Sequence, residues 1–186
     1  MITTTIVGEM ITREAEQTEC VVVIESLESF QKNMKDREFD ALVASCRKLG
    51  GIFTHFNDVA NIYPGRFIFV NKDGDEFQQL FCLLHEIEHF TCWNTNCDCR
   101  DGDQSDREYC AFLRSAVKIL DSNYDNTVKY DLLVMFVKQI EKKANGNTRH
   151  HFYKKAAKEM MDNDIWIECK RFVAVRELAH ILIPPE

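Results

Sequence analysis

The chain lacks any long hydrophobic run. Its apolar stretches, such as Cys20 to Ile24 and Phe81 to Leu84, are short, and none approaches the ~20 residues that a membrane-spanning helix needs. The first residues also lack a basic segment followed by an apolar core, the pattern of a signal peptide. We therefore expect no membrane span and no export signal, and we predict a cytoplasmic location.

Basic residues are also in short supply. The sequence has 23 Lys and Arg against 30 Asp and Glu, which gives a formal net charge of -7. Nucleic-acid binding needs a basic surface that displaces counterions, so we expect no nucleic-acid partner. A disordered chain is excluded as well, because hydrophobic residues make up 45% of the sequence and include 13 Phe.

Strand patterns come first in the chain, and helical patterns follow. Residues 3–7, 20–24, 52–56 and 66–70 are predicted strands. Helical spacing predicts helices over residues 26–49, 76–93, 106–120, 126–144, 148–161 and 171–182. This order indicates an α+β fold. No internal repeat or low-complexity linker marks a boundary, so we predict one domain over residues 1–186, with a helical C-terminal part over about 121–186.

The most informative residues lie in the predicted helix 76–93, where the sequence reads His85-Glu86-Ile87-Glu88-His89. Residues four apart share one face of a helix, so both imidazoles can bind one Zn²⁺ at about 2.0–2.1 Å. Glu86 then stands beside the metal, where a carboxylate can deprotonate a zinc-bound water and pass the proton to a leaving amine. The pattern predicts a zinc site with Glu86 as the catalytic base.

The surroundings of this motif favour a metal site over chance. A random sequence of this composition would contain roughly 0.02 such motifs. On a helical wheel, both histidines fall at the edge of an apolar stripe and Glu86 falls off it. The stripe consists of Phe77, Leu80, Phe81 and Leu84. A ligand pair at such an edge is half inside the protein and half facing a cleft.

A catalytic zinc needs a third protein ligand. Glu108 begins the next predicted helix near its apolar face, where a carboxylate requires a cationic partner. An alternative is a capping box, in which Glu108 accepts a hydrogen bond from the backbone N–H of Ser105. Other carboxylates also remain candidates for the third ligand. They are Glu88, Asp101, Asp103 and Asp106.

The segment from Phe67 to Leu120 resembles the ImmA/IrrE-type family of zincin-like metallopeptidases. The resemblance rests on the apolar residues 77–84 before His85, and on Glu108, which follows the second histidine by 19 residues and has Phe112 four residues on. Glu88 stands where the family usually has glycine. No helix-turn-helix segment, a common partner of the family, is evident.

This resemblance implies a fold, a ligand set and an activity. The zinc ligands would be His85, His89 and Glu108, with Glu86 as the base and a short N-terminal sheet packed against the active helix. The implied activity is cleavage of a peptide bond in a specific protein or peptide substrate, often a regulatory protein. The rival interpretation is a non-catalytic, metal-stabilised module that binds a protein partner. The presence of Glu86 favours catalysis, because a purely structural metal has no need of a base.

Four of the eight cysteines follow the His85–His89 motif in sequence: Cys92, Cys97, Cys99 and Cys110. Cys97-Asp98-Cys99 lacks the two-residue gap of common zinc knuckles. We favour ordinary reduced thiols, as expected in a cytosolic protein. A second metal site and disulfides remain open alternatives.

Overall fold

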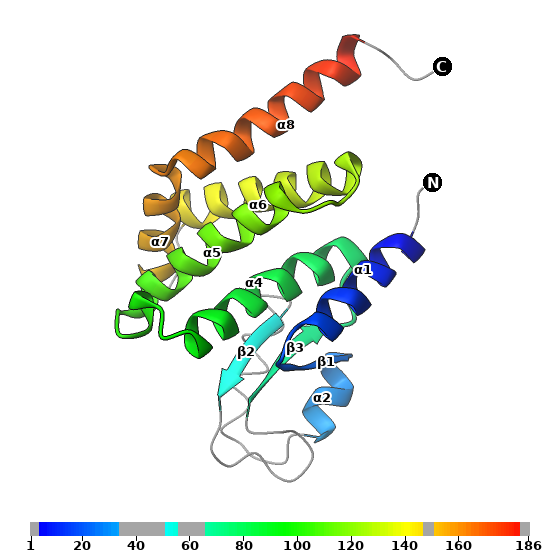
Figure 1. The fold of residues 1–186 in the computed structure, drawn as a ribbon, viewed down its shortest axis with the longest axis vertical. Coiled ribbons are helices and arrows are strands. Elements are labelled where there is room, and N and C mark those ends of the chain that lie inside the picture. The colour runs from blue at the N-terminus through cyan, green and yellow to red at the C-terminus, as the bar shows by residue number, and fades with distance from the viewer. Residues whose placement is uncertain (1–3, 34–50, 56–65, 147–150, 183–186) are drawn as a thin grey trace. The chain divides into compact units, whose positions relative to one another are not determined.

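The chain folds as an α+β protein with a small sheet and several helices (Figure 1). The structure is a computed structural model and describes residues 4–33, 51–55, 66–146 and 151–182. The elements in chain order are α1 (Thr4–Gln17), β1 (Val21–Glu25), α2 (Leu27–Asn33), β2 (Gly51–His55), β3 (Arg66–Asn71), α4 (Glu76–Asn94), the 3-10 helix η1 (Asp98–Arg100), α5 (Gln104–Asp121), α6 (Asn126–Asn145), α7 (His151–Met161) and α8 (Asp164–Leu182).

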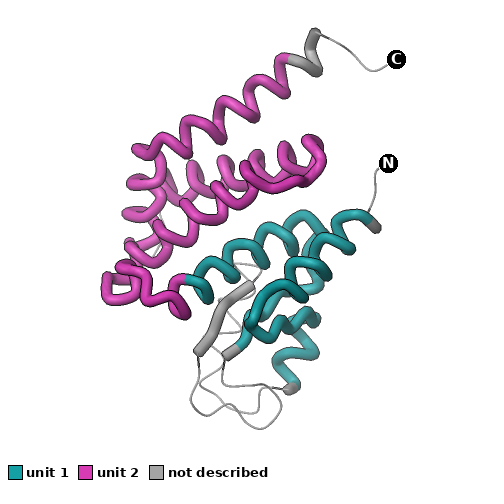
Figure 2. Tube along the Cα trace, in the orientation of Figure 1, with its two compact units in different colours: residues 1–91 teal, residues 92–186 magenta. Residues whose placement is uncertain are grey.

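Two compact units make up the chain, residues 1–91 and residues 92–186 (Figure 2). Unit 1 contains the sheet and most of α4. In the part of unit 2 that the structure describes, every regular element is a helix. The helical part therefore begins near Cys92, before the expected position around 121. A single domain over residues 1–186 stays a prediction.

The sheet of unit 1 has three strands in the order β1-β3-β2. β3 is central and pairs in parallel with β1 and antiparallel with β2. Residues Phe67 to Val70 of β3 are fully buried, as expected for a strand covered on both faces. On one face, Phe30 of α2 stacks on Phe69 at a centroid distance of 4.0 Å. This contact fixes α2 against the sheet.

The predicted strands over 20–24, 52–56 and 66–70 are confirmed as β1, β2 and β3, although residue 56 lies outside the described part. The predicted helix over 26–49 begins as expected, because the Ser26 hydroxyl accepts a hydrogen bond from the Ser29 backbone N–H at 3.1 Å. Its described portion is α2, and residues 34–49 lie outside the described residues. The helices predicted from residue 76 to residue 161 are present with small shifts at their ends, and residues 148–150 also lie outside the description.

The predicted strand over 3–7 is wrong, because residues from Thr4 onward form α1. The β-branched residues suggested a strand, but Val7, Ile11 and Glu14 are buried at spacings of four and three residues. Burial of one helical face therefore outweighs the weak strand preference of single residues. Thr3 lies outside the described residues.

The last helix, α8, begins at Asp164, earlier than the predicted start at residue 171. The Asn163 side chain accepts a hydrogen bond from the Ile165 backbone N–H at 2.9 Å, which supports the earlier start. Trp166 and Cys169 are buried three residues apart within the added residues 164–170. Among the described residues, no helix is long and apolar enough to cross a membrane.

Unit 2 has a core of its own. α6 contacts α7 and α8, and α5 contacts α7. Phe136 lies near Trp166 of α8 with ring centroids 6.2 Å apart. The fully buried residues of these helices include Ile119, Leu132, Leu133 and Met160. This packing holds α5, which carries Glu108 and Cys110.

Candidate metal centres

His85 and His89 lie one turn apart on α4, within unit 1. Their Nε2 atoms are 3.2 Å apart, and their rings meet edge to face with centroids 4.7 Å apart. Two nitrogens bound to one tetrahedral zinc at about 2.0–2.1 Å lie about 3.3–3.4 Å from each other. The pair therefore has the spacing of two ligands of one metal ion. In the absence of a metal, the same spacing allows one ring N–H to donate to the other ring.

Glu86 is buried, with 8% of its surface exposed. The expectation that it lies off the buried surface of the helix is wrong. α4 is buried around nearly its whole circumference from Leu80 to Glu88, which is typical of a helix enclosed by other elements. Glu88 is buried as the wheel suggested, with 7% exposed.

Glu108 is a buried residue of α5 in unit 2. The predicted ligands are thus carried by both units, with His85 and His89 in unit 1. Glu108 as third ligand stays a sequence-based prediction.

The proposed capping box of Ser105 and Glu108 is not formed, because α5 begins earlier than expected. Asp103 is the N-cap and accepts hydrogen bonds from the backbone N–H groups of Ser105 and Asp106. Asp106 completes the box by accepting from the Asp103 backbone N–H at 3.0 Å. The capping explanation for Glu108 is thereby removed. Two of the aspartates that were alternative ligands, Asp103 and Asp106, have a helix-capping role.

The end of α4 brings two cysteines together. Asn96 has a φ of 51°, in the left-handed region, and the Cys97 backbone N–H donates to the Cys92 carbonyl at 3.2 Å. This is the bond pattern of a Schellman motif, which folds the chain back over the last helical turn. Cys97 consequently returns beside Cys92. The following turns are closed by bonds from Arg100 N–H to Cys97 O and from Gly102 N–H to Cys99 O.

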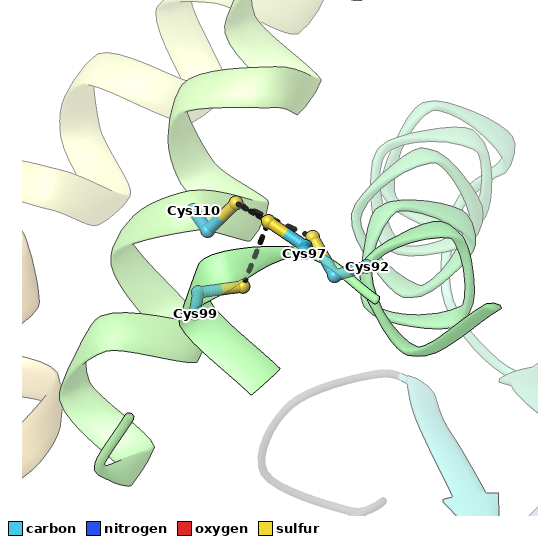
Figure 3. A group of neighbouring side chains, drawn as sticks. All are labelled: Cys92, Cys97, Cys99 and Cys110. Atoms are coloured by element: carbon cyan, nitrogen blue, oxygen red, sulfur yellow. Dashed lines mark hydrogen bonds between the residues drawn. The ribbon is translucent and has the colours of Figure 1, made fainter. Parts of the chain in front are cut away.

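Four thiols converge at this point, all within unit 2 (Figure 3). We call them the cysteine cluster: Cys92, Cys97, Cys99 and Cys110. The Sγ atoms of Cys92 and Cys110 are 3.3 Å apart, those of Cys97 and Cys110 are 3.7 Å apart, and those of Cys97 and Cys99 are 3.4 Å apart. All four sulfurs lie within 4.8 Å of one another, so the group could hold a metal ion. None of the described cysteines is joined to another in a disulfide.

Mutual hydrogen bonding and burial shift the pKa of three of these thiols in different directions. The hydrogen bond from Cys92 lowers the pKa of Cys110 to about 5, against the opposing effect of burial. The same hydrogen bond and burial raise the pKa of Cys92. Burial raises the pKa of Cys99 to about 12, and its hydrogen bond with Cys97 adds to this. Cys110 therefore becomes a thiolate, the form that binds metals, at a lower pH than Cys92 and Cys99.

Comparison of the chain with protein-family models, curated proteins and solved structures finds no match. The argument for function therefore rests on the residues themselves. The sequence predicted the histidine pair correctly as neighbours on a helix, because helical spacing alone determines their separation. It did not predict the cysteine cluster, because the spacing that matters depends on a turn at Asn96. The sequence signal for this turn was Asn96, a polar residue that tolerates a positive φ and lies two residues after the last residue of α4.

Proposed function

We propose that this chain is a zinc-dependent peptidase that cleaves a peptide bond in a specific protein or peptide substrate. The observation that carries the proposal is the 3.2 Å separation of the His85 and His89 Nε2 atoms on α4, with Glu86 next to the first histidine. The proposed ligands are His85, His89 and, on the strength of the sequence, Glu108. The resemblance to the ImmA/IrrE-type zincin-like peptidases belongs to this proposal, together with a cytoplasmic location and a regulatory protein as substrate.

Each residue has a separate chemical role. A bound zinc supplies a Lewis acid that polarises the scissile carbonyl and makes water more acidic. Glu86 accepts a proton from the attacking water and returns it to the leaving amine. Its burial keeps bulk water from competing for this proton. The two imidazoles leave room for one more protein ligand and one open position at a tetrahedral ion, as catalytic zinc sites require.

The second candidate function is a non-catalytic, metal-stabilised module that binds a protein partner. The cysteine cluster favours it, because a set of four protein ligands holds a metal without chemistry at that metal. The two candidates differ in whether Glu86 is needed for function.

Zinc analysis of matched variants tests the histidine site. We would compare the Cys97→Ser/Cys99→Ser protein with the same protein carrying His85→Ala, so that metal in the cysteine cluster does not contribute. The expected result is about one zinc per chain in the first and near none in the second. Equal zinc content in both, with both proteins folded, would refute the site. If the zinc site is present, cleavage of an unstructured protein substrate by the protein with His85, and its loss in the His85→Ala variant, would support the peptidase activity.

A further inference from the structure

The thiols of Cys92, Cys97, Cys99 and Cys110 come from three parts of unit 2: the last turn of α4, the η1 segment and α5. Four cysteines brought to one point by separate elements form a cluster that ordinary core packing does not require. The remaining described cysteines, Cys20, Cys82 and Cys169, are buried thiols outside this cluster. A single ligand bound by all four thiols would account for this convergence.

We propose that the cysteine cluster is a structural zinc site with four sulfur ligands, distinct from the proposed histidine site. Four sulfurs at about 2.3 Å from one tetrahedral zinc lie about 3.7–3.8 Å from each other. Three of the Sγ separations, 3.3, 3.4 and 3.7 Å, fall at or slightly inside this value. The remaining Sγ pairs lie within 4.8 Å of one another.

The chemistry of the ligands selects the metal. Four thiolates in tetrahedral arrangement suit zinc or iron–sulfur chemistry, whereas Ca²⁺ and Mg²⁺ require oxygen ligands. In an iron–sulfur cluster, different cysteines bind different iron atoms. Four sulfurs that can reach one point therefore fit a single ion better. Zn²⁺ then binds the four sulfurs as thiolates, and the protons that the thiols still hold are released to solvent, leaving a tetrathiolate of net charge −2.

The role of this site follows from its ligand count. Four protein ligands fill a tetrahedral zinc, so no position remains for water or substrate. The ion would instead join the end of α4, η1 and the first half of α5. The segment between them is a run of short turns in which Asn94, Thr95, Asn96 and Asp98 are exposed, so few apolar contacts hold it. The site is independent of the peptidase proposal.

The test uses the full-length chain with His85→Ala/His89→Ala, which removes the proposed histidine site. This protein, purified under reducing conditions with zinc, should contain about one zinc per chain by elemental analysis. Adding Cys97→Ser/Cys99→Ser should reduce the zinc content to near zero, because it removes two of the four sulfur ligands. These two positions are chosen because both are half-buried and tolerate serine better than the buried Cys92. The matched control adds Cys82→Ser/Cys169→Ser, two buried cysteines outside the cluster, and should keep its zinc.

Several results would overturn the proposal. These are a folded histidine variant that binds no zinc, iron in place of zinc, or equal zinc with and without Cys97 and Cys99. If the serine variant fails to fold, Co²⁺ added to the histidine variant decides instead. Sulfur ligation would give a thiolate-to-cobalt charge-transfer band and strong visible bands of a tetrahedral ion, and a spectrum without them would contradict four-sulfur binding. The histidine site is judged separately, by the extra zinc of the wild type over the histidine variant.

Discussion

At the scale of the residue, substitution of Glu86, the proposed base, tests catalysis separately from metal binding. Glu86→Gln keeps the shape of a buried side chain but removes the base, so peptidase activity should fall by about 10²–10⁴. Zinc content and Tm should stay close to those of the wild type. Cleavage of an unstructured protein substrate, zinc analysis and thermal unfolding of the same preparation would measure all three.

The outcome of this substitution also distinguishes the two candidate functions. If biological function survives in Glu86→Gln and is lost in His85→Ala, the chain is a metal-stabilised binding module. A large loss of Tm in Glu86→Gln would show instead that the buried carboxylate is needed for folding, and the comparison would then move to Glu86→Asp. That change keeps the negative charge but shortens the side chain by one methylene group.

Glu108 is tested by comparison with Asp106, two residues earlier on the same helix. Glu108→Gln should weaken zinc binding at the histidine site by about tenfold or more, because a neutral amide is a poor substitute for a carboxylate ligand. Asp106→Asn alters the capping box and should leave zinc affinity unchanged. Both affinities would be measured by competition with a chelator in the Cys97→Ser/Cys99→Ser protein. Unchanged affinity in Glu108→Gln would make the buried Glu88 the next candidate.

At the scale of the element, Asp103 controls the start of α5. Hydrogen bonds from the Ser105 hydroxyl and from the Asp106 backbone N–H lower the pKa of Asp103 to about 2, below its unfolded value of about 3.9. A depressed pKa contributes stability that is complete above pH 4 and is lost as the pH falls toward 2. Asp103→Ala should lower Tm by a few degrees at neutral pH, and this deficit should shrink between pH 4 and 2.

Asp103→Asn is the matched control for this prediction. Asparagine is also a good N-cap, so the variant should keep most of the neutral-pH stability and lose the pH dependence between 4 and 2. Thermal unfolding of the three proteins across this pH range gives the comparison. A deficit of Asp103→Ala that stays constant as the pH falls would show that the carboxylate charge is not involved.

Elements were predictable where local pattern and burial agree. β3 is rich in β-branched and aromatic residues, and its residues Phe67 to Val70 are fully buried, so the strand pattern is correct. The first residues of α1 are β-branched too, yet they form a helix because Val7 and Ile11 are buried on one helical face. Only tertiary packing separates these two cases. The start of α5 was misassigned for a different reason, since both Asp103 and Ser105 are good N-caps and sequence does not decide between them.

At the scale of the whole molecule, the two candidate sites differ in how much of their geometry the sequence predicts. His85 and His89 share one helix, so their proximity follows from helical geometry. The cysteine cluster joins residues up to 18 positions apart through a Schellman turn and two further turns. Its geometry depends on where α4 ends and where α5 begins, and element ends are what sequence patterns fix least well.

Metal removal should affect the chain locally, because each unit has its own core. In the His85→Ala/His89→Ala protein, chelation of zinc should increase amide hydrogen exchange at Cys97, Arg100 and Gly102. Their backbone N–H groups close the turns of the cysteine cluster, and with few apolar contacts there, a bound ion would be the main constraint on them. The amides of β3 should stay protected, since residues 67–70 are fully buried in unit 1.

Hydrogen–deuterium exchange read by mass spectrometry, with and without chelator, measures both regions in one sample. The Cys97→Ser/Cys99→Ser version of the same protein is the control, and its exchange should not respond to chelator. An increase spread evenly over β3 and the turns would mean that the ion supports the fold of the entire chain. No change at the turns would mean that hydrogen bonds among the thiols already hold them, and the cluster would then have no structural need of zinc.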